Sequence, residues 1–141
     1  MASLVGINLG EIDGENQIPP TMYPKVGESV EFKRLLLDEY IDKNQTLKLK
    51  EFLIEYYGID AGIFVLDDDK LFVSEGEHIL FEILEKKIIS ISVNERDGFV
   101  SISANMPTSE YAANTCINAR KILQTIVTVS YTHLRAHETN S

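Results

Sequence analysis

The sequence predicts an α+β fold, a two-layer sandwich in which helices pack on one face of an antiparallel sheet. Two runs of alternating apolar and serine residues surround an Asp97-Gly98 pair, which is a strong signal for a β-hairpin. Helical periodicity is clear in residues 47–57 and again after Pro107. The expected order of elements is therefore strand, helix, hairpin, short helix, hairpin and helix.

Residues 1–28 are interpreted as an N-terminal arm. Val5, Ile7 and Leu9 alternate as in a strand, but glycines and prolines interrupt any longer element. One short strand and an irregular connection are expected here. Residues 30–41 are ambiguous, because their apolar positions fit both a strand and a helical stripe. A strand is the favoured interpretation of that segment.

Residues 47–57 predict a helix more firmly. Their apolar side chains recur at i, i+3, i+4, i+7 and i+8, and Gly58 stands where a C-terminal cap belongs. Two short apolar runs, 61–66 and 71–73, flank a polar turn and predict a hairpin. The following segment, 75–86, predicts a short helix with one apolar face formed by Ile79, Leu80, Ile83 and Leu84.

The hairpin in residues 88–105 has one apolar face and one face lined with serines. We therefore expect the sheet to bury one side and to leave the other wet or against a polar interface. Pro107, Thr108 and Ser109 then begin a final helix. Small residues early in this helix allow it to lie close to the sheet, and its apolar stripe is Ala112, Cys116, Ala119, Leu123 and Ile126.

Residues 129–139 (VSYTHLRAHET) are similar to one reading frame of a transposase-type sequencing adapter, a scar of fragmentary metagenome-derived chains. Residues 128–141 are therefore interpreted as a non-native tail. The α+β domain is assigned to residues 29–127, and we expect the natural protein to continue beyond Val127. With the tail set aside, His78 is the only histidine left.

Composition excludes several classes of function. The net charge of −9, with no basic stripe, argues against direct nucleic-acid binding. The single cysteine, Cys116, excludes an internal disulfide and fits a reducing compartment. No signal peptide and no apolar run long enough for a membrane span is present, so a cytoplasmic protein without a membrane partner is expected.

The acidic clusters do not match a metal site. Asp67, Asp68 and Asp69 lack the ligand spacing of a calcium loop and fit a solvated turn. His78 and Glu82 share a helical face, but no second histidine or cysteine completes a coordination shell. We expect no metal and no cofactor, and the residues that would bind any ligand stay unknown.

Catalytic groups are also missing from the pattern. Cys116 lies on the apolar stripe of the last helix, where a buried, inert thiol is expected, and no histidine base accompanies it. Phosphate-binding glycine loops are absent. Tyr56, Tyr57 and Phe64 would be able to stack on a ligand, but their spacing favours core packing.

Two stretches resemble the bacterial type of S-adenosylmethionine decarboxylase. Residues 32–40 (FKRLLLDEY) are similar to the first strand of that family. Residues 98–113 (GFVSISANMPTSEYAA) are similar to its Ser-Ile-His-Thr-aromatic-Pro-Glu strand, although Ser103 occupies the histidine position and one residue is inserted. The order of elements in residues 30–127 also resembles the half-sandwich of the family.

The departures from this family are in the catalytic positions. Family members form a pyruvoyl cofactor by self-cleavage at a Glu-Ser bond, whereas here Glu95 is followed by Arg96. The only Glu-Ser pair, Glu28-Ser29, lies upstream, and Cys116 follows Tyr111 too closely for the family's cysteine. The resemblance therefore implies a decarboxylase-like domain with no catalytic residue.

Domains of this kind are known ahead of aminopropyltransferases, where they serve dimerisation. The resemblance thus implies a non-catalytic dimerisation or regulatory domain that forms a homodimer, in the N-terminal part of a polyamine-biosynthesis protein whose downstream catalytic domain is missing here. The alternative is a stand-alone acidic adaptor or virion-associated protein that binds a partner through the arm, residues 1–28. A third hypothesis, a self-processing enzyme, predicts cleavage near residue 95 or residue 28.

Overall fold

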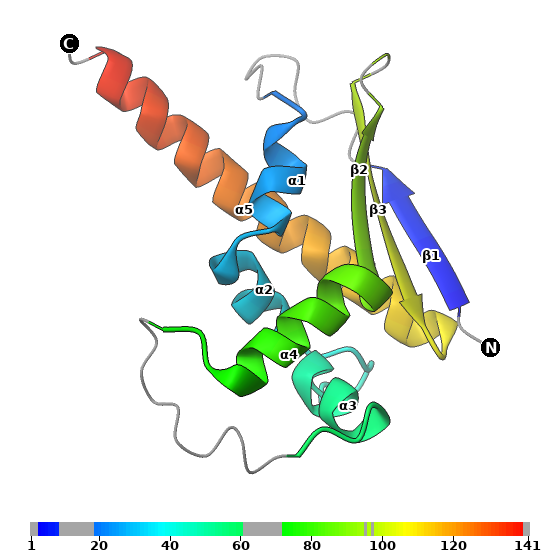
Figure 1. Ribbon diagram of the computed structural model, residues 1–141. Helices are drawn as coiled ribbons and strands as arrows, with labels where there is room; N and C mark the ends of the chain where they lie inside the picture. The colour runs from blue at the N-terminus through cyan, green and yellow to red at the C-terminus, as the bar shows by residue number, and fades with distance from the viewer. Residues whose placement is uncertain (1–2, 9–18, 61–71, 95, 97, 140–141) are drawn as a thin grey trace.

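The computed structural model of the chain describes residues 3–8, 19–60, 72–94, 96 and 98–139. Within them, helices pack against an open antiparallel sheet, which confirms the expected α+β sandwich (Figure 1). The hairpin expected around Asp67, Asp68 and Asp69, together with Phe64, lies outside the described residues except for Phe72 and Val73, which are exposed and belong to no strand of the described residues.

The sheet has three strands in the order β1-β3-β2. The expected hairpin is confirmed as β2 (Ile89–Asn94) and β3 (Phe99–Met106), joined through Gly98 with a φ of 72°. β1 (Ser3–Asn8), the short strand expected in the arm, pairs antiparallel with the other side of β3. β3 therefore lies between the N-terminal strand β1 and its hairpin partner β2.

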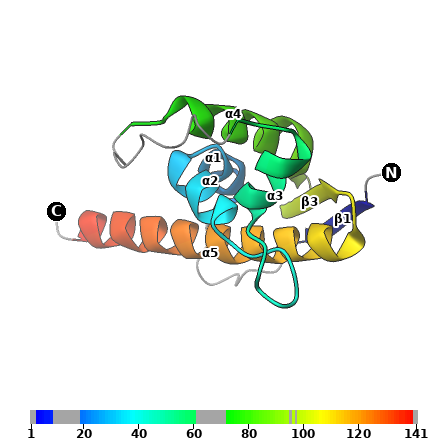
Figure 2. The ribbon, with the colours of Figure 1, turned by 90° about the horizontal axis from the view of Figure 1, so that it is seen from below.

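The inner face of the sheet is apolar and covered by helix α5 (Ser109–Thr139). Val100, Ile102, Ala104 and Met106 of β3 are all buried, as alternation predicts. Fully buried small residues of α5, among them Ala112, let the helix lie close to the strands. α5 runs the length of the molecule, with α1 and α2 between it and α4 (Figure 2).

Residues 30–41 do not form the favoured strand. Helix α2 (Val30–Leu37) occupies this segment, and its N-cap Ser29 accepts a hydrogen bond from the Phe32 backbone amide at 3.2 Å. Phe32, Leu36 and Leu37 are buried. Because helical spacing turns all three toward the core, whereas alternation would expose Leu37, the helix buries more apolar surface than a strand.

Helix α1 (Met22–Gly27) forms where an irregular connection was expected. It packs against β2 and α5. Gly27 is the point of closest approach, since a Cβ there would collide with Cδ1 of Ile91 on β2. Both β1 and α1 fall within the range assigned to the arm, so parts of that range belong to the packed structure.

The two other expected helices are present. Helix α3 (Leu49–Tyr56) ends before Gly58, whose φ of 64° fits the expected cap. Helix α4 (Glu75–Ile83) begins at N-cap Ser74 and continues as a single π-helical turn, η2 (Leu84–Ile88). Phe81 and Leu84 of this segment are buried in the core.

Helix α5 begins at the expected position, where the Tyr111 amide donates a hydrogen bond to Thr108 Oγ1 at 3.1 Å. Val127 is fully buried, whereas Thr128, Val129 and Ser130 are exposed. Among the described residues, none of the helices combines the length and apolar character needed to cross a membrane.

Candidate functional site

The outer face of the sheet carries small, uncharged side chains. Ser90 lies opposite Ser103, and Ser92 lies opposite Ser101, across the β2–β3 pair. Among the described residues, the helices lie on the other side of the sheet, so none of these helices covers this face (Figure 1). We call this surface the serine face, and its described members are Gly6, Ser90, Ser92, Asn94, Phe99, Ser101, Ser103 and Asn105.

Charge is absent from the strands that build the serine face. Their sequences, SLVGIN, ISISVN and FVSISANM, contain no acidic or basic residue. A solvated sheet face usually carries lysine or glutamate, which prevents association of sheets. In a chain with a net charge of −9, the strands of the serine face therefore add no negative charge of their own.

Cys116 lies on the opposite side of the sheet from Ser103. Its side chain is fully buried, and Sγ donates to the Val5 carbonyl at 3.1 Å. Burial raises the pKa of the thiol, which keeps it protonated at neutral pH. The thiol is therefore a core group, and the sheet separates it from the position that the family resemblance compared with a histidine.

Ser29 of the upstream Glu28-Ser29 pair is the N-cap of α2. Ser29 Oγ donates to the Val26 carbonyl at 2.6 Å while it accepts from the Phe32 amide. A hydroxyl held in this way points into the turn between α1 and α2. Its role is to begin α2, so the pair has no group free for attack on the preceding carbonyl.

His78 is exposed on α4, and its partner in the helical pair is engaged elsewhere. Glu82 Oε1 accepts a hydrogen bond from Lys86 Nζ at 2.7 Å, which lowers the pKa of the carboxyl group. Within the described part of the chain, no group of three metal-ligating side chains exists.

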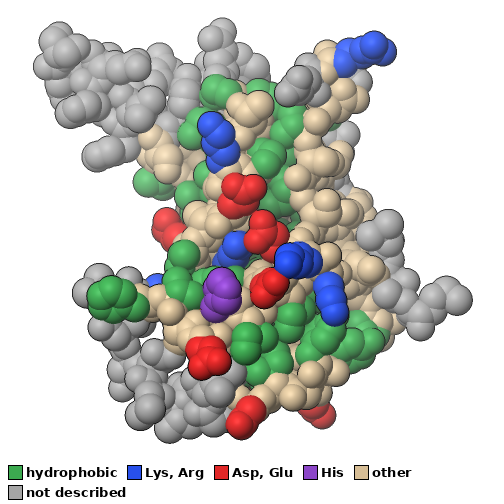
Figure 3. Space-filling view, viewed as in Figure 1, with side chains coloured by type: hydrophobic (Ala, Val, Ile, Leu, Met, Phe, Trp, Pro, Cys, Tyr) green, Lys and Arg blue, Asp and Glu red, His purple; other side chains and the backbone are tan. Residues whose placement is uncertain are grey.

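A hollow of about 350 Å³ lies where α3, η2 and the end of β3 meet. Tyr56 at the end of α3 and its C-cap Tyr57 form one wall, and Lys86 and Lys87 of η2 lie beside them, with Asn105 on the sheet side. We call these five residues and their enclosed volume the aromatic–lysine pocket. Basic side chains border a hydrophobic patch near α3 on this side of the molecule (Figure 3).

Of the two tyrosines of this pocket, Tyr56 corrects the core interpretation of the sequence, whereas Tyr57 packs against the core as expected. Tyr56 is 59% exposed, and its ring stacks on Phe52 with centroids 5.3 Å apart. Tyr57 is partly buried and meets Tyr56 edge-on at 5.1 Å. The adjacent tyrosines and the adjacent lysines are visible in the sequence, but nothing in it indicates that the two pairs meet.

A second, smaller hollow of about 190 Å³ lies between α2, η2 and β2. Lys33 borders it with an exposure of only 9%, and its Nζ is 3.3 Å from Glu85 Oε2 and 5.7 Å from the Phe81 ring centroid. These contacts tie α2 to the α4–η2 segment. The lysine is thereby engaged in packing and ion pairing inside the protein.

No family model, no curated protein and no solved structure matches the chain. The fold and these surfaces define an α+β two-layer module with an open, uncharged sheet face and a peripheral pocket.

Proposed function

We propose that this protein is a non-catalytic module that pairs two copies of itself through the serine face. The observation that carries the proposal is the lack of any charged residue in the three strands of an acidic chain. Two such faces approach without like-charge repulsion, and small serines permit close stacking of sheets. Phe99, which is 37% exposed, supplies an aromatic anchor at one end.

The state of the nucleophilic groups supports a non-catalytic role. Cys116 is buried and protonated, and Ser29 is held in a helix cap. His78, the one histidine whose side chain the structure describes, is exposed on α4 and accompanies neither group as a base. Self-association therefore accounts for more of the observed surface features than an enzymatic activity does.

The resemblance to the decarboxylase family extends this proposal to a biological setting. In that setting the module precedes an aminopropyltransferase of polyamine synthesis and holds two of its subunits together. The natural gene sequence downstream of the codon for Val127 tests this part alone. A methyltransferase-like continuation supports the setting, and an early stop codon contradicts it.

Sedimentation of the full chain tests the pairing. We expect a dimer at tens of micromolar and a monomer after the double substitution Ser92→Glu and Ser101→Glu, which places opposed negative charges on the serine face. Asn44→Glu with Thr128→Glu adds the same charge at exposed positions elsewhere and should stay dimeric. A monomeric wild-type chain, or a dimer that ignores the serine-face charges, contradicts the proposal.

A second candidate function is an adaptor that binds a different protein through the arm. One observation favours it: β1 lies at the edge of the sheet, and among the described residues it pairs with β3 on one side only, so its other edge offers a place for an added strand. An adaptor should sediment as a monomer when pure. Its β1 amides should exchange with solvent more slowly once the partner is bound.

A further inference from the structure

We propose that the aromatic–lysine pocket binds a small planar aromatic molecule that carries an anionic group. The site touches the serine face at Asn105, but its aromatic and basic walls lie outside that face, and the proposal does not rest on self-association. Its volume of about 350 Å³ falls in the lower part of the range of small-molecule sites, about 300–1,000 Å³. The pocket is therefore large enough for one or two fused rings with a charged substituent.

The aromatic wall selects a flat ligand. Tyr56 is held at a fixed angle by stacking on Phe52, with an interplanar angle of 21° and centroids 5.3 Å apart. Its ring is nevertheless 59% exposed, which leaves a rigid aromatic surface open to solvent. A planar ring stacks on such a surface with little entropy cost, because the tyrosine is already ordered.

The basic wall selects a negative charge. Lys87 Nζ lies 5.2 Å from the Tyr57 ring centroid, and Lys87 forms no ion pair with any carboxylate of the described residues. Lys86 is held by Glu82 at 2.7 Å. Lys87 is thus the cation available to an incoming anion, and it stands beside the aromatic surface.

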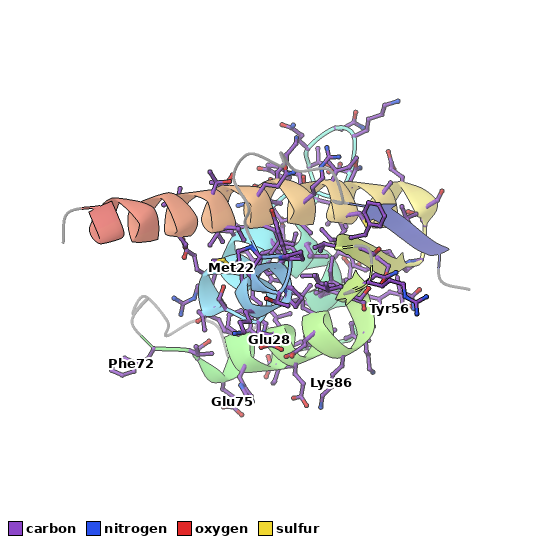
Figure 4. All side chains as sticks on the ribbon, turned by 90° about the horizontal axis from the view of Figure 1, so that it is seen from above. Met22, Glu28, Tyr56, Phe72, Glu75 and Lys86 are labelled. Carbon is purple, nitrogen blue, oxygen red and sulfur yellow. The ribbon has the colours of Figure 1, made fainter. Side chains whose placement is uncertain are left out.

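The backbone at this position is unusual as well. Lys86 and Lys87 both lie in the π-helical turn η2. Single π-helical turns are less stable than α-helix and occur frequently at functional sites. Here the turn places two consecutive lysines next to α3. Figure 4 shows Tyr56 and Lys86 toward one end of the molecule and Phe72 toward the other.

The remaining lining gives the pocket a polar contact. Asn105 is exposed at the end of β3, and its amide can both donate and accept hydrogen bonds. A single nucleic-acid strand is a poorer match, because the net charge of −9 repels a long polyanion.

The experiment uses full-length, isotopically labelled protein titrated with 1-naphthyl phosphate and followed by amide chemical shifts. We expect saturable shifts at Tyr56, Lys87 and Asn105. 1-Naphthol supplies the ring alone, and inorganic phosphate supplies the charge alone. Each should bind at least about tenfold more weakly than 1-naphthyl phosphate, since it uses one wall of the pocket.

Two variants separate the contribution of the aromatic wall to binding from that of the basic wall. Tyr56→Leu and Lys87→Gln should each raise the dissociation constant by about tenfold. Lys43→Gln, at an exposed lysine in a loop, removes the same charge away from the pocket and should bind as the wild type does. Both pocket side chains are exposed, so the variants should fold, and circular dichroism checks this. If Tyr56→Leu unfolds, the chemical-shift map of the wild type and the dissociation constant of Lys87→Gln test the proposal.

Three results would overturn the proposal. Shifts scattered away from the pocket would show that the probe binds elsewhere. If Lys87→Gln bound 1-naphthyl phosphate as tightly as the wild type does, the pocket would not select for the anionic group. Equal binding of 1-naphthol and 1-naphthyl phosphate would reduce the pocket to a hydrophobic surface.

Discussion

Arg34 binds Glu77 through two hydrogen bonds, from Nε to Oε2 at 2.7 Å and from Nη2 to Oε1 at 2.9 Å. The pair joins α2 to the first turn of α4, and both side chains are about three-quarters buried, with 27% and 25% exposed. Glu77 also belongs to the capping box of α4, in which its amide donates to Ser74 Oγ at 3.0 Å. The Glu77 carboxylate accepts from the Ser74 amide at 3.4 Å as well as from Arg34, so one carboxylate contributes both to the start of a helix and to its position in the fold.

The charge of Glu77 should matter for stability in a pH-dependent way. Glu77→Gln keeps the shape and the cap but removes the charge, and we expect it to lower the free energy of unfolding at neutral pH by about 1–3 kcal/mol. The bonds from Arg34 lower the pKa of Glu77 below its usual 4.5 in the folded state. The stabilisation is therefore present above the unfolded-state pKa and is lost as pH falls through the folded-state pKa.

Urea denaturation of both proteins between neutral and acidic pH measures this effect. The difference between wild type and Glu77→Gln should shrink once the pH falls below about 4.5. Glu75→Gln changes an exposed glutamate in the same helical turn and should have a small effect at every pH. A Glu77→Gln difference that is constant with pH would show that the charge is not responsible.

Two asparagines of α5, one turn apart, hold the segment that follows α2. Asn114 Nδ2 donates to the Ile41 carbonyl at 2.8 Å, and Asn118 Nδ2 donates to the Tyr40 carbonyl at 2.9 Å. Ile41 is 1% exposed, whereas Tyr40 is 39% exposed. Water can replace the second bond more readily than the first.

Asn114→Ala should therefore lower the free energy of unfolding by about 1–3 kcal/mol, because it leaves a buried carbonyl without a donor. Asn118→Ala should lower the free energy of unfolding by less than about 1 kcal/mol. Thermal or urea unfolding of the two variants measures the contrast. Equal losses would mean that solvent reaches both carbonyls alike.

The sheet was predictable from sequence, whereas α2 was not. Ser90 and Ser92 alternate with apolar residues before an Asp-Gly turn, and a local pattern of that kind leaves little choice of structure. Residues 30–41 fit two periodicities at once. Only the cap at Ser29 and the joint burial of Leu36 and Leu37 favour the helix, and burial depends on the rest of the fold.

The candidate pocket was less accessible to sequence reasoning than the serine face. The serine face follows from alternation within one hairpin, so it is local. The pocket joins Tyr56 to Lys87 and Asn105 through tertiary packing. Exposure of Tyr56 is likewise a tertiary property, because its helical spacing alone fits a buried stripe.

Burial of Cys116 leads to a prediction about its reactivity. Its side chain has no exposed surface, and burial raises the pKa of the thiol. The folded protein should react with an aromatic disulfide reagent at neutral pH at least about a hundredfold more slowly than the urea-unfolded chain. Stopped-flow absorbance measures both rates. A comparable rate in the folded state would show a reactive thiolate and would reopen nucleophilic catalysis.

The boundary of the stable core should lie near Val127. That residue is fully buried, and Thr128, Val129 and Ser130 are exposed. Deletion of residues 128–141 should therefore change the free energy of unfolding by less than about 0.5 kcal/mol. Leu123→Ala, at a fully buried position one turn earlier, should cost about 2–5 kcal/mol. Urea denaturation of the shortened chain and of the point variant compares the two. If the deletion cost as much as Leu123→Ala, the last fourteen positions (128–141) would contribute to the core, and their interpretation as a non-native tail would be wrong.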